Sequence, residues 1–89
     1  MALQILNAGP SPDEVAARIR SSIEDKLPGA RVEVRPQGPG HFEIDVSSDA
    51  FAGKSRVQQQ QLVYAAITHL MAGSSPPVHA VDRMECRVP

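Results

Sequence analysis

The spacing of apolar residues changes along this chain from a helical period to a strand period, and this change most limits its fold. Between residues 11 and 29, apolar side chains recur at every fourth position, which predicts one amphipathic helix; they are Val15, Ile19, Ile23 and Leu27. Between residues 31 and 46 they alternate with polar residues, which predicts two half-buried strands. The Gly/Pro-rich segment 36–40 joins these strands, so we expect a β-hairpin.

Capping motifs indicate where the two main helices begin. A Ser-x-x-Glu box at residues 11–14 precedes the first helix, and a Ser-x-x-Gln box at residues 55–58 precedes the second. The first helix is expected to end at the Pro-Gly pair 28–29. The second is expected to continue to residue 71, and one short helical turn anchored by Phe51 is expected before it.

The last part of the chain predicts a third strand. Residues 74–77 are Ser-Ser-Pro-Pro, a linker that cannot be helical. Residues 78–88 follow with imperfect alternation, which predicts a bulge or a fraying end. The order helix, strand, strand, short helix, long helix, strand predicts an α+β domain, with helices on one face of a three-stranded sheet. We expect residues 1–10 to form a loose N-terminal tail and residues 11–89 to form a single domain.

Composition excludes several classes of protein. The chain has 89 residues, 42% of them hydrophobic, and a net charge of −1, which does not fit a disordered tail or a generic cationic nucleic-acid-binding protein. Its one cysteine, Cys86, excludes a disulfide framework and a multi-cysteine zinc site supplied by this chain alone. No apolar run approaches the roughly 18–20 residues that span a bilayer, and residues 1–6 do not resemble a secretory signal. We therefore expect a cytoplasmic protein without a membrane partner.

The residues that carry catalytic chemistry elsewhere form no such arrangement in this sequence. No Ser/His/Asp or Cys/His set has local support, and Cys86 has the pattern of a small hydrophobic residue near the sheet. Residues 53–55 imitate the end of a phosphate-binding loop, but Ser48 stands where that motif needs its first glycine. We expect no enzymatic activity. Lys54 and Arg56 flank a helix N-terminus and are typical of an anionic contact surface.

Two of the three histidines begin predicted strands. His41 follows the Gly/Pro segment, and His79 follows the Pro-Pro linker, whereas His69 lies on the long helix as a surface residue. His41 and His79 could approach each other if both strands begin at one end of the sheet. Two imidazoles do not complete a metal site, because metal ions usually take four or more ligands. A partner protein or an exogenous thiolate would have to supply the remaining ligands.

Four ordered motifs resemble the BolA family, over most of the chain from about residue 12 to residue 88. They are HFEI at 41–44, VSSDAFAGKSRVQ at 46–58, QLVYAA at 61–66 and VHAV at 78–81. The resemblance implies a class II KH-like fold, α+β with the order α-β-β-α-α-β and helices packed on one face of a three-stranded mixed sheet. This order agrees with the one expected from the periodicity above.

The resemblance also implies a function and a set of site residues. BolA-like proteins pair with monothiol glutaredoxins and share a labile [2Fe-2S] cluster, for iron-sulfur trafficking or for iron and redox sensing. Glutaredoxin and glutathione supply thiolates, and the family's late histidine, the other ligand, corresponds to His79. Histidine ligation raises the potential of such a cluster. The isolated chain is then expected to be a monomer without a cofactor, and Lys54, Ser55 and Arg56, with the hairpin, are the candidate partner surface.

This sequence departs from the family pattern in the hairpin loop and at the start of the long helix. Many relatives carry a second His or Cys in the loop, which here contains none, so the second ligand is either His41 or absent. Residues 59–61 are glutamines where many relatives have Arg-His-Arg. The alternative function is a DNA-binding transcriptional regulator that uses the helix-turn-helix-like segment 49–71. It needs a cationic face, and only Lys54 and Arg56 stand at the turn.

Overall fold

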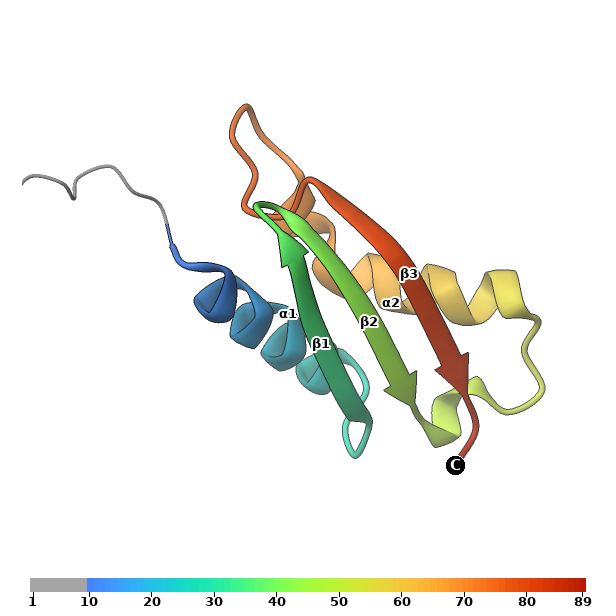
Figure 1. Ribbon diagram of the computed structural model, residues 1–89. Helices are drawn as coiled ribbons and strands as arrows, with labels where there is room; N and C mark the ends of the chain where they lie inside the picture. The colour runs from blue at the N-terminus through green and yellow to red at the C-terminus, as the bar shows by residue number, and fades with distance from the viewer. Residues whose placement is uncertain (1–9) are drawn as a thin grey trace, which may run out of the picture.

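The computed structural model describes residues 10–89, and Figure 1 shows how its elements are arranged. They are α1 (Pro12–Lys26), β1 (Arg31–Gly38), β2 (His41–Ser47), the 3-10 turn η2 (Asp49–Phe51), α2 (Arg56–Met71) and β3 (Ala80–Arg87). This order confirms the one expected from the sequence. The loose tail expected at residues 1–10 lies outside the described residues, apart from Pro10.

The sheet is mixed and three-stranded, with the spatial order β1-β2-β3. β1 pairs antiparallel with β2, and β2 pairs parallel with β3. Figure 1 shows both helices on one face of this sheet, α1 behind β1 and α2 behind β3. The predicted α+β class, with helices on a single face, is confirmed.

The core lies between the helices and this face of the sheet. The helices α1 and α2 and the central strand β2 contribute most of the buried apolar residues, whereas the apolar residues of β1 and β3 are only partly buried. Phe51 anchors η2 with no exposed surface. The buried apolar side chains are Val15, Ile19, Ile23, Leu27, Phe42, Ile44, Val46, Phe51, Val63, Ala66, Ile67, Leu70 and Val78. Both predicted capping boxes are formed, at Ser11 and at Ser55.

The hairpin is tighter than the sequence predicted. β1 continues through Pro36 to Gly38, so the turn consists of residues 39–40 and not of the whole segment 36–40. The sequence analysis places Pro36 in the connecting segment, but β1 is an edge strand, where a residue without an N–H is tolerated. The register also shifts between Pro36 and Gly38, which leaves Gln37 without a counterpart on β2.

A bulge interrupts β3 near its start, as the imperfect alternation predicted. The register between β2 and β3 shifts after Phe42, which leaves Asp82 as an extra residue. Asp82 and Arg83 are therefore both exposed, whereas Val81 and Met84 on either side pack against the core. Among residues 10–89, no helix has the length and apolar character required to cross a membrane.

Candidate functional site

Backbone hydrogen bonds fix the position of His79 just before β3. The N–H groups of His79 and Ala80 both donate to the carbonyl oxygen of Gly40, at 2.8 and 3.0 Å. The preceding residue, Val78, is completely buried and donates its N–H to the carbonyl oxygen of Leu70 at 3.1 Å. His79 is thus held between the turn of the hairpin and the end of α2.

The imidazole of His79 is accessible although its backbone is fixed. The side chain is exposed, and no hydrogen bond within residues 10–89 involves either ring nitrogen. The ring lies against the open side of Gly40: a Cβ at Gly40 would be 2.6 Å from Cγ of His79 and 2.8 Å from Nδ1. Gly40 has a φ of 78°, so a residue without a Cβ serves both the turn and the ring.

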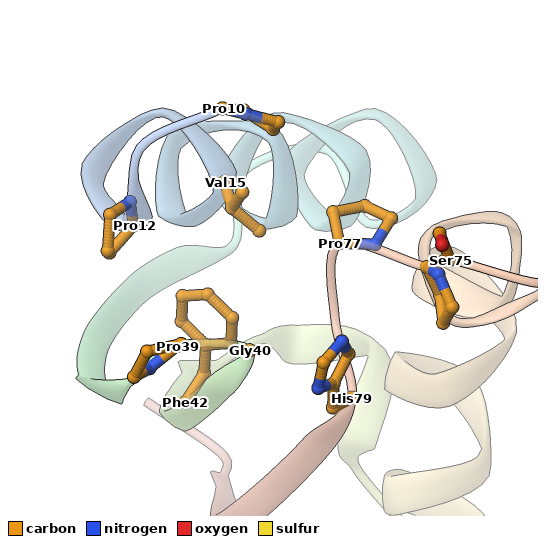
Figure 2. Close-up of a pocket in the computed structure, with 10 residues that line it drawn as sticks. Pro10, Pro12, Val15, Pro39, Gly40, Phe42, Ser75, Pro77 and His79 are labelled. Atoms are coloured by element: carbon orange, nitrogen blue, oxygen red, sulfur yellow. The ribbon is translucent and has the colours of Figure 1, made fainter. Parts of the chain in front are cut away.

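An apolar recess of about 430 Å³ opens beside His79 (Figure 2). Phe42 and Val15 form its apolar wall, and prolines from three separate segments, residues 10–12, 39 and 76–77, line the rest. Figure 2 shows the ring of His79 at the edge of this space, next to Gly40. In the described part of the chain, the lining contains no Asp, Glu, Lys or Arg. A molecule that approaches His79 from this recess therefore meets a mostly apolar lining.

His41 and His79 lie at the same end of the sheet but not on the same face. His41 is the Cα partner of Ala80, so the two strands begin together, which is the condition that the sequence set for an approach of the two rings. His41 alternates with the buried Phe42 and therefore projects from the face without helices. Its Nδ1 is 3.0 Å from Oδ1 of the exposed Asp82. The structure does not bring the two rings together, and His41 remains only a predicted second ligand.

The segment Lys54–Arg56 lies at the opposite end of the molecule from His79. All three residues are exposed at the start of α2, and the Ser55 hydroxyl accepts a hydrogen bond from the N–H of Gln58. This start lies near the ends of the strands, where the N–H of Ser48 donates to the carbonyl oxygen of Arg87. The 16 residues of α2 give the helix a length of about 24 Å. These residues therefore lie near the open end of the hairpin, where Arg31 pairs with Ser47, and far from its turn, and they remain a predicted partner surface.

The helix-turn-helix-like pair expected over residues 49–71 has one full helix. Its first member, η2, is a three-residue 3-10 turn, whereas a recognition pair requires two helices. Asp49 adds a negative charge near Lys54 and Arg56 in sequence. The geometry adds no support to the DNA-binding alternative.

No three His, Cys, Asp or Glu side chains among residues 10–89 are grouped so that they could hold a metal ion. His79 fits the role of a single imidazole ligand, because its ring is exposed and its nitrogens are unpaired within these residues. A metal centre at His79 would therefore require ligands from another molecule.

Comparison with known proteins assigns the family. The BolA family, described as BolA-like protein, matches residues 17–87. This chain belongs to the BolA-like family. The BolA-like protein 1 of Bos taurus is 34% identical to it, with 84% of this chain and 59% of the relative covered. The BolA-like chain thus spans less than two thirds of the length of this curated relative.

Solved BolA structures share the fold. BolA1 from Mus musculus superposes with a TM-score of 0.75 at 30% identity, covering 100% of this chain and 77% of the mouse chain. The BolA domain of SufE1 from Arabidopsis thaliana gives a TM-score of 0.70, also at 30% identity, and covers 92% and 96% of the two chains. The resemblance drawn from the four sequence motifs is confirmed.

Sequence reasoning did not single out two residues that shape this end of the BolA-like domain. The carbonyl oxygen of Gly40 accepts the backbone hydrogen bonds of His79 and Ala80, its Cα lies against the His79 ring, and Asp82 contacts His41. The Pro-Gly pair before the second strand indicated a turn at Gly40, but it did not indicate the contact with His79. That contact joins residues 39 positions apart, so no local pattern reveals it. For Asp82, the imperfect alternation of residues 78–88 indicated a bulge but not which residue forms it.

Replacing Gly40 with alanine should displace the His79 ring and lower stability. The new Cβ would collide with that ring, and a positive φ costs an L-residue about 1–2 kcal/mol. Gly53 is a matched control, since its φ is 76° and a Cβ added there would meet no atom within 4 Å beyond its chain neighbours. Gly40→Ala should shift the NMR signals of the His79 ring and lose more unfolding free energy than Gly53→Ala. Equal losses and unshifted ring signals would show that the close approach is not present.

The thiol of Cys86 should be unreactive near neutral pH. Burial raises its pKa, and the nearby carboxylate of Glu85 raises it further. Because the thiolate is the nucleophile, the pH midpoint for alkylation should be higher in the folded protein than in urea. The raised pKa of the Cys86 thiol contributes to the free energy of unfolding at pH values below the pKa of the thiol in the unfolded chain. This contribution is lost as pH rises through the pKa of the thiol in the folded chain. Cys86→Ala should lack that alkaline loss, and identical alkylation midpoints would contradict the assignment.

Proposed function

We propose that this BolA-like chain is an adaptor that binds a monothiol glutaredoxin and supplies one ligand, His79, to a [2Fe-2S] cluster shared between them. The observation that carries the proposal is the accessible imidazole of His79, whose backbone is fixed by two hydrogen bonds to Gly40. A ligand that is exposed but pre-positioned loses little conformational freedom when a second protein arrives.

The donor set fits a shared cluster better than a resident metal site. His79 offers one nitrogen, and the remaining ligands would be thiolates from glutaredoxin and glutathione. Histidine in place of cysteine raises the cluster potential. The apolar recess beside His79 would keep water and charged side chains away from one side of the cluster. A cluster held partly by each partner suits transfer or sensing.

The family comparison supports association with other proteins in general. In SufE1 of Arabidopsis thaliana, the BolA fold is a domain of another named protein. A fold that operates beside a second protein module fits an adaptor better than a self-contained catalyst.

The proposal is tested by anaerobic reconstitution. The full chain is mixed with a monothiol glutaredoxin, ferric iron, sulfide and glutathione, and visible circular dichroism is recorded. The cluster spectrum should differ from that of glutaredoxin reconstituted alone, because imidazole and thiolate ligation give different transitions. Two controls omit glutaredoxin or the BolA-like chain. A mixture whose spectrum superposes on that of glutaredoxin alone would refute the shared cluster.

A further inference from the structure

One edge of the sheet is open along β3. Within residues 10–89, β3 pairs with β2 on one side and with no strand on the other. The carbonyl oxygen of Arg87 accepts from Ser48 and therefore points toward β2. Because backbone groups alternate along a strand, those of Met84 and Cys86 point to the open edge. Such an edge is a template for another strand.

The exposed large apolar side chains of the described residues all lie on this side of the molecule. They are Val57, Tyr64 and Val88, with exposed fractions of 61%, 38% and 46%. Val88 directly follows β3. On α2, Val57 and Tyr64 lie roughly 100–120° around the helix axis from the buried Val63. His69, which contacts Ser22 of α1, lies a similar angle in the other direction, so Val57 and Tyr64 face away from α1.

This flank of α2 runs beside the open edge. The helix begins near the end of β3 and ends where the carbonyl oxygen of Leu70 accepts from Val78, so α2 and β3 run in opposite directions. Figure 1 shows α2 extending past β3 on the side away from α1. Residues 57–71 contain no Asp, Glu, Lys or Arg. We call residues 84–88 together with Val57 and Tyr64 the β3 side.

The charges on the β3 side are complementary to those of a second copy of the same chain. In an antiparallel pair of two β3 strands centred on Cys86, Glu85 of each copy lies opposite Arg87 of the other. Met84 then lies opposite Val88, which gives the exposed Val88 an apolar neighbour. Arg87 has no salt bridge within the described residues. This register places no like charges opposite each other, and it leaves the bulge at Asp82 outside the paired segment.

We propose that two copies of this chain associate through the β3 side, around a two-fold axis at Cys86, and form one continuous six-stranded sheet. The symmetry doubles each contact, because an isologous interface uses the same surface on both subunits. The apolar flanks of the two α2 helices would then cover each other behind the joined strands. The proposal does not depend on the cluster function, and its test decides between this dimer and the monomer expected from the sequence.

Sedimentation velocity of the full chain over a range of concentrations tests the proposal. The wild-type chain should form dimers as concentration rises. Arg87→Glu places two like-charged pairs across the interface and should raise the dissociation constant at least about tenfold. The exchange Glu85→Arg with Arg87→Glu restores opposite charges between copies and should recover dimerisation. Arg20→Glu, an equal charge change on the exposed face of α1, is the matched control and should leave the dimer unchanged.

Three results would overturn the dimer. The first is a wild-type chain that sediments as a monomer at every concentration. The second is an Arg87→Glu variant that dimerises like the wild type. The third is an Arg20→Glu variant that weakens association as much as Arg87→Glu does. Far-UV circular dichroism of each variant confirms that the exposed substitutions leave the fold intact. A reconstituted mixture whose spectrum equals that of glutaredoxin alone, with the dimer intact, would refute the proposed function and leave this interface standing.

Discussion

Replacing His79 with alanine should abolish the change that this chain produces in the visible circular dichroism of a glutaredoxin-bound cluster. Alanine keeps the backbone hydrogen bonds from residues 79 and 80 to Gly40 but removes both ring nitrogens. Because the side chain is exposed and contributes nothing to the buried core, the variant should fold normally. The spectrum of the mixture should then equal that of glutaredoxin reconstituted alone.

The other two histidines provide matched controls for this experiment. His41 stands at the same end of the sheet but on the face without helices, and His69 lies on α2 beside Ser22. Because the proposed function takes a single ligand from this chain, His41→Ala, like His69→Ala, should retain the spectrum of the wild-type mixture. If His79→Ala retains it, the ligand assignment is wrong. If His41→Ala alone loses it, the ligand is His41 and the geometry around Gly40 has no part in cluster binding.

The elements that the sequence predicted correctly are those whose signals are local. Each capping box, at Ser11 and at Ser55, is defined by residues within four consecutive positions, so the first residue of each helix could be predicted from the sequence. The apolar alternation of residues 41–46 fixes which face is buried. The extent of β1 was missed because Pro36 reads locally as a breaker, and its tolerance depends on β1 being an edge strand.

Candidate residues for the site could be named from the sequence, but their geometry could not. The motif at residues 78–81 singled out His79, but only the parallel pairing of β2 with β3 shows that His41 and His79 lie at one end of the sheet. The face on which each ring lies depends on backbone bonds between the hairpin turn and residues 79–80, which are distant in sequence. The separation of Lys54–Arg56 from His79 likewise follows from the direction of α2 across the sheet. The sequence pattern does not indicate the direction in which a helix crosses the sheet.

Replacing Phe51 with alanine should cause the largest loss of stability. The chain contains two phenylalanines and no tryptophan, so each aromatic ring is a large fraction of a small core. Phe51 is fully buried in η2, the short turn between β2 and α2. Removing a buried ring of this kind typically costs about 3–5 kcal/mol, through lost burial and the cavity left behind. A domain of this size has a total unfolding free energy of about 4–13 kcal/mol.

The loss should therefore be a large fraction of the domain's stability, and urea denaturation followed by far-UV circular dichroism measures it. Gln61→Ala truncates an exposed residue of α2 and should change the unfolding free energy by no more than about 0.5 kcal/mol. If Phe51→Ala is unfolded without urea, Phe51→Leu keeps part of the side chain and should show an intermediate loss. An unfolding free energy for Phe51→Ala close to that of Gln61→Ala would mean that η2 is not anchored in the core. In that case the start of α2, and with it the segment Lys54–Arg56, would be free to move relative to the sheet.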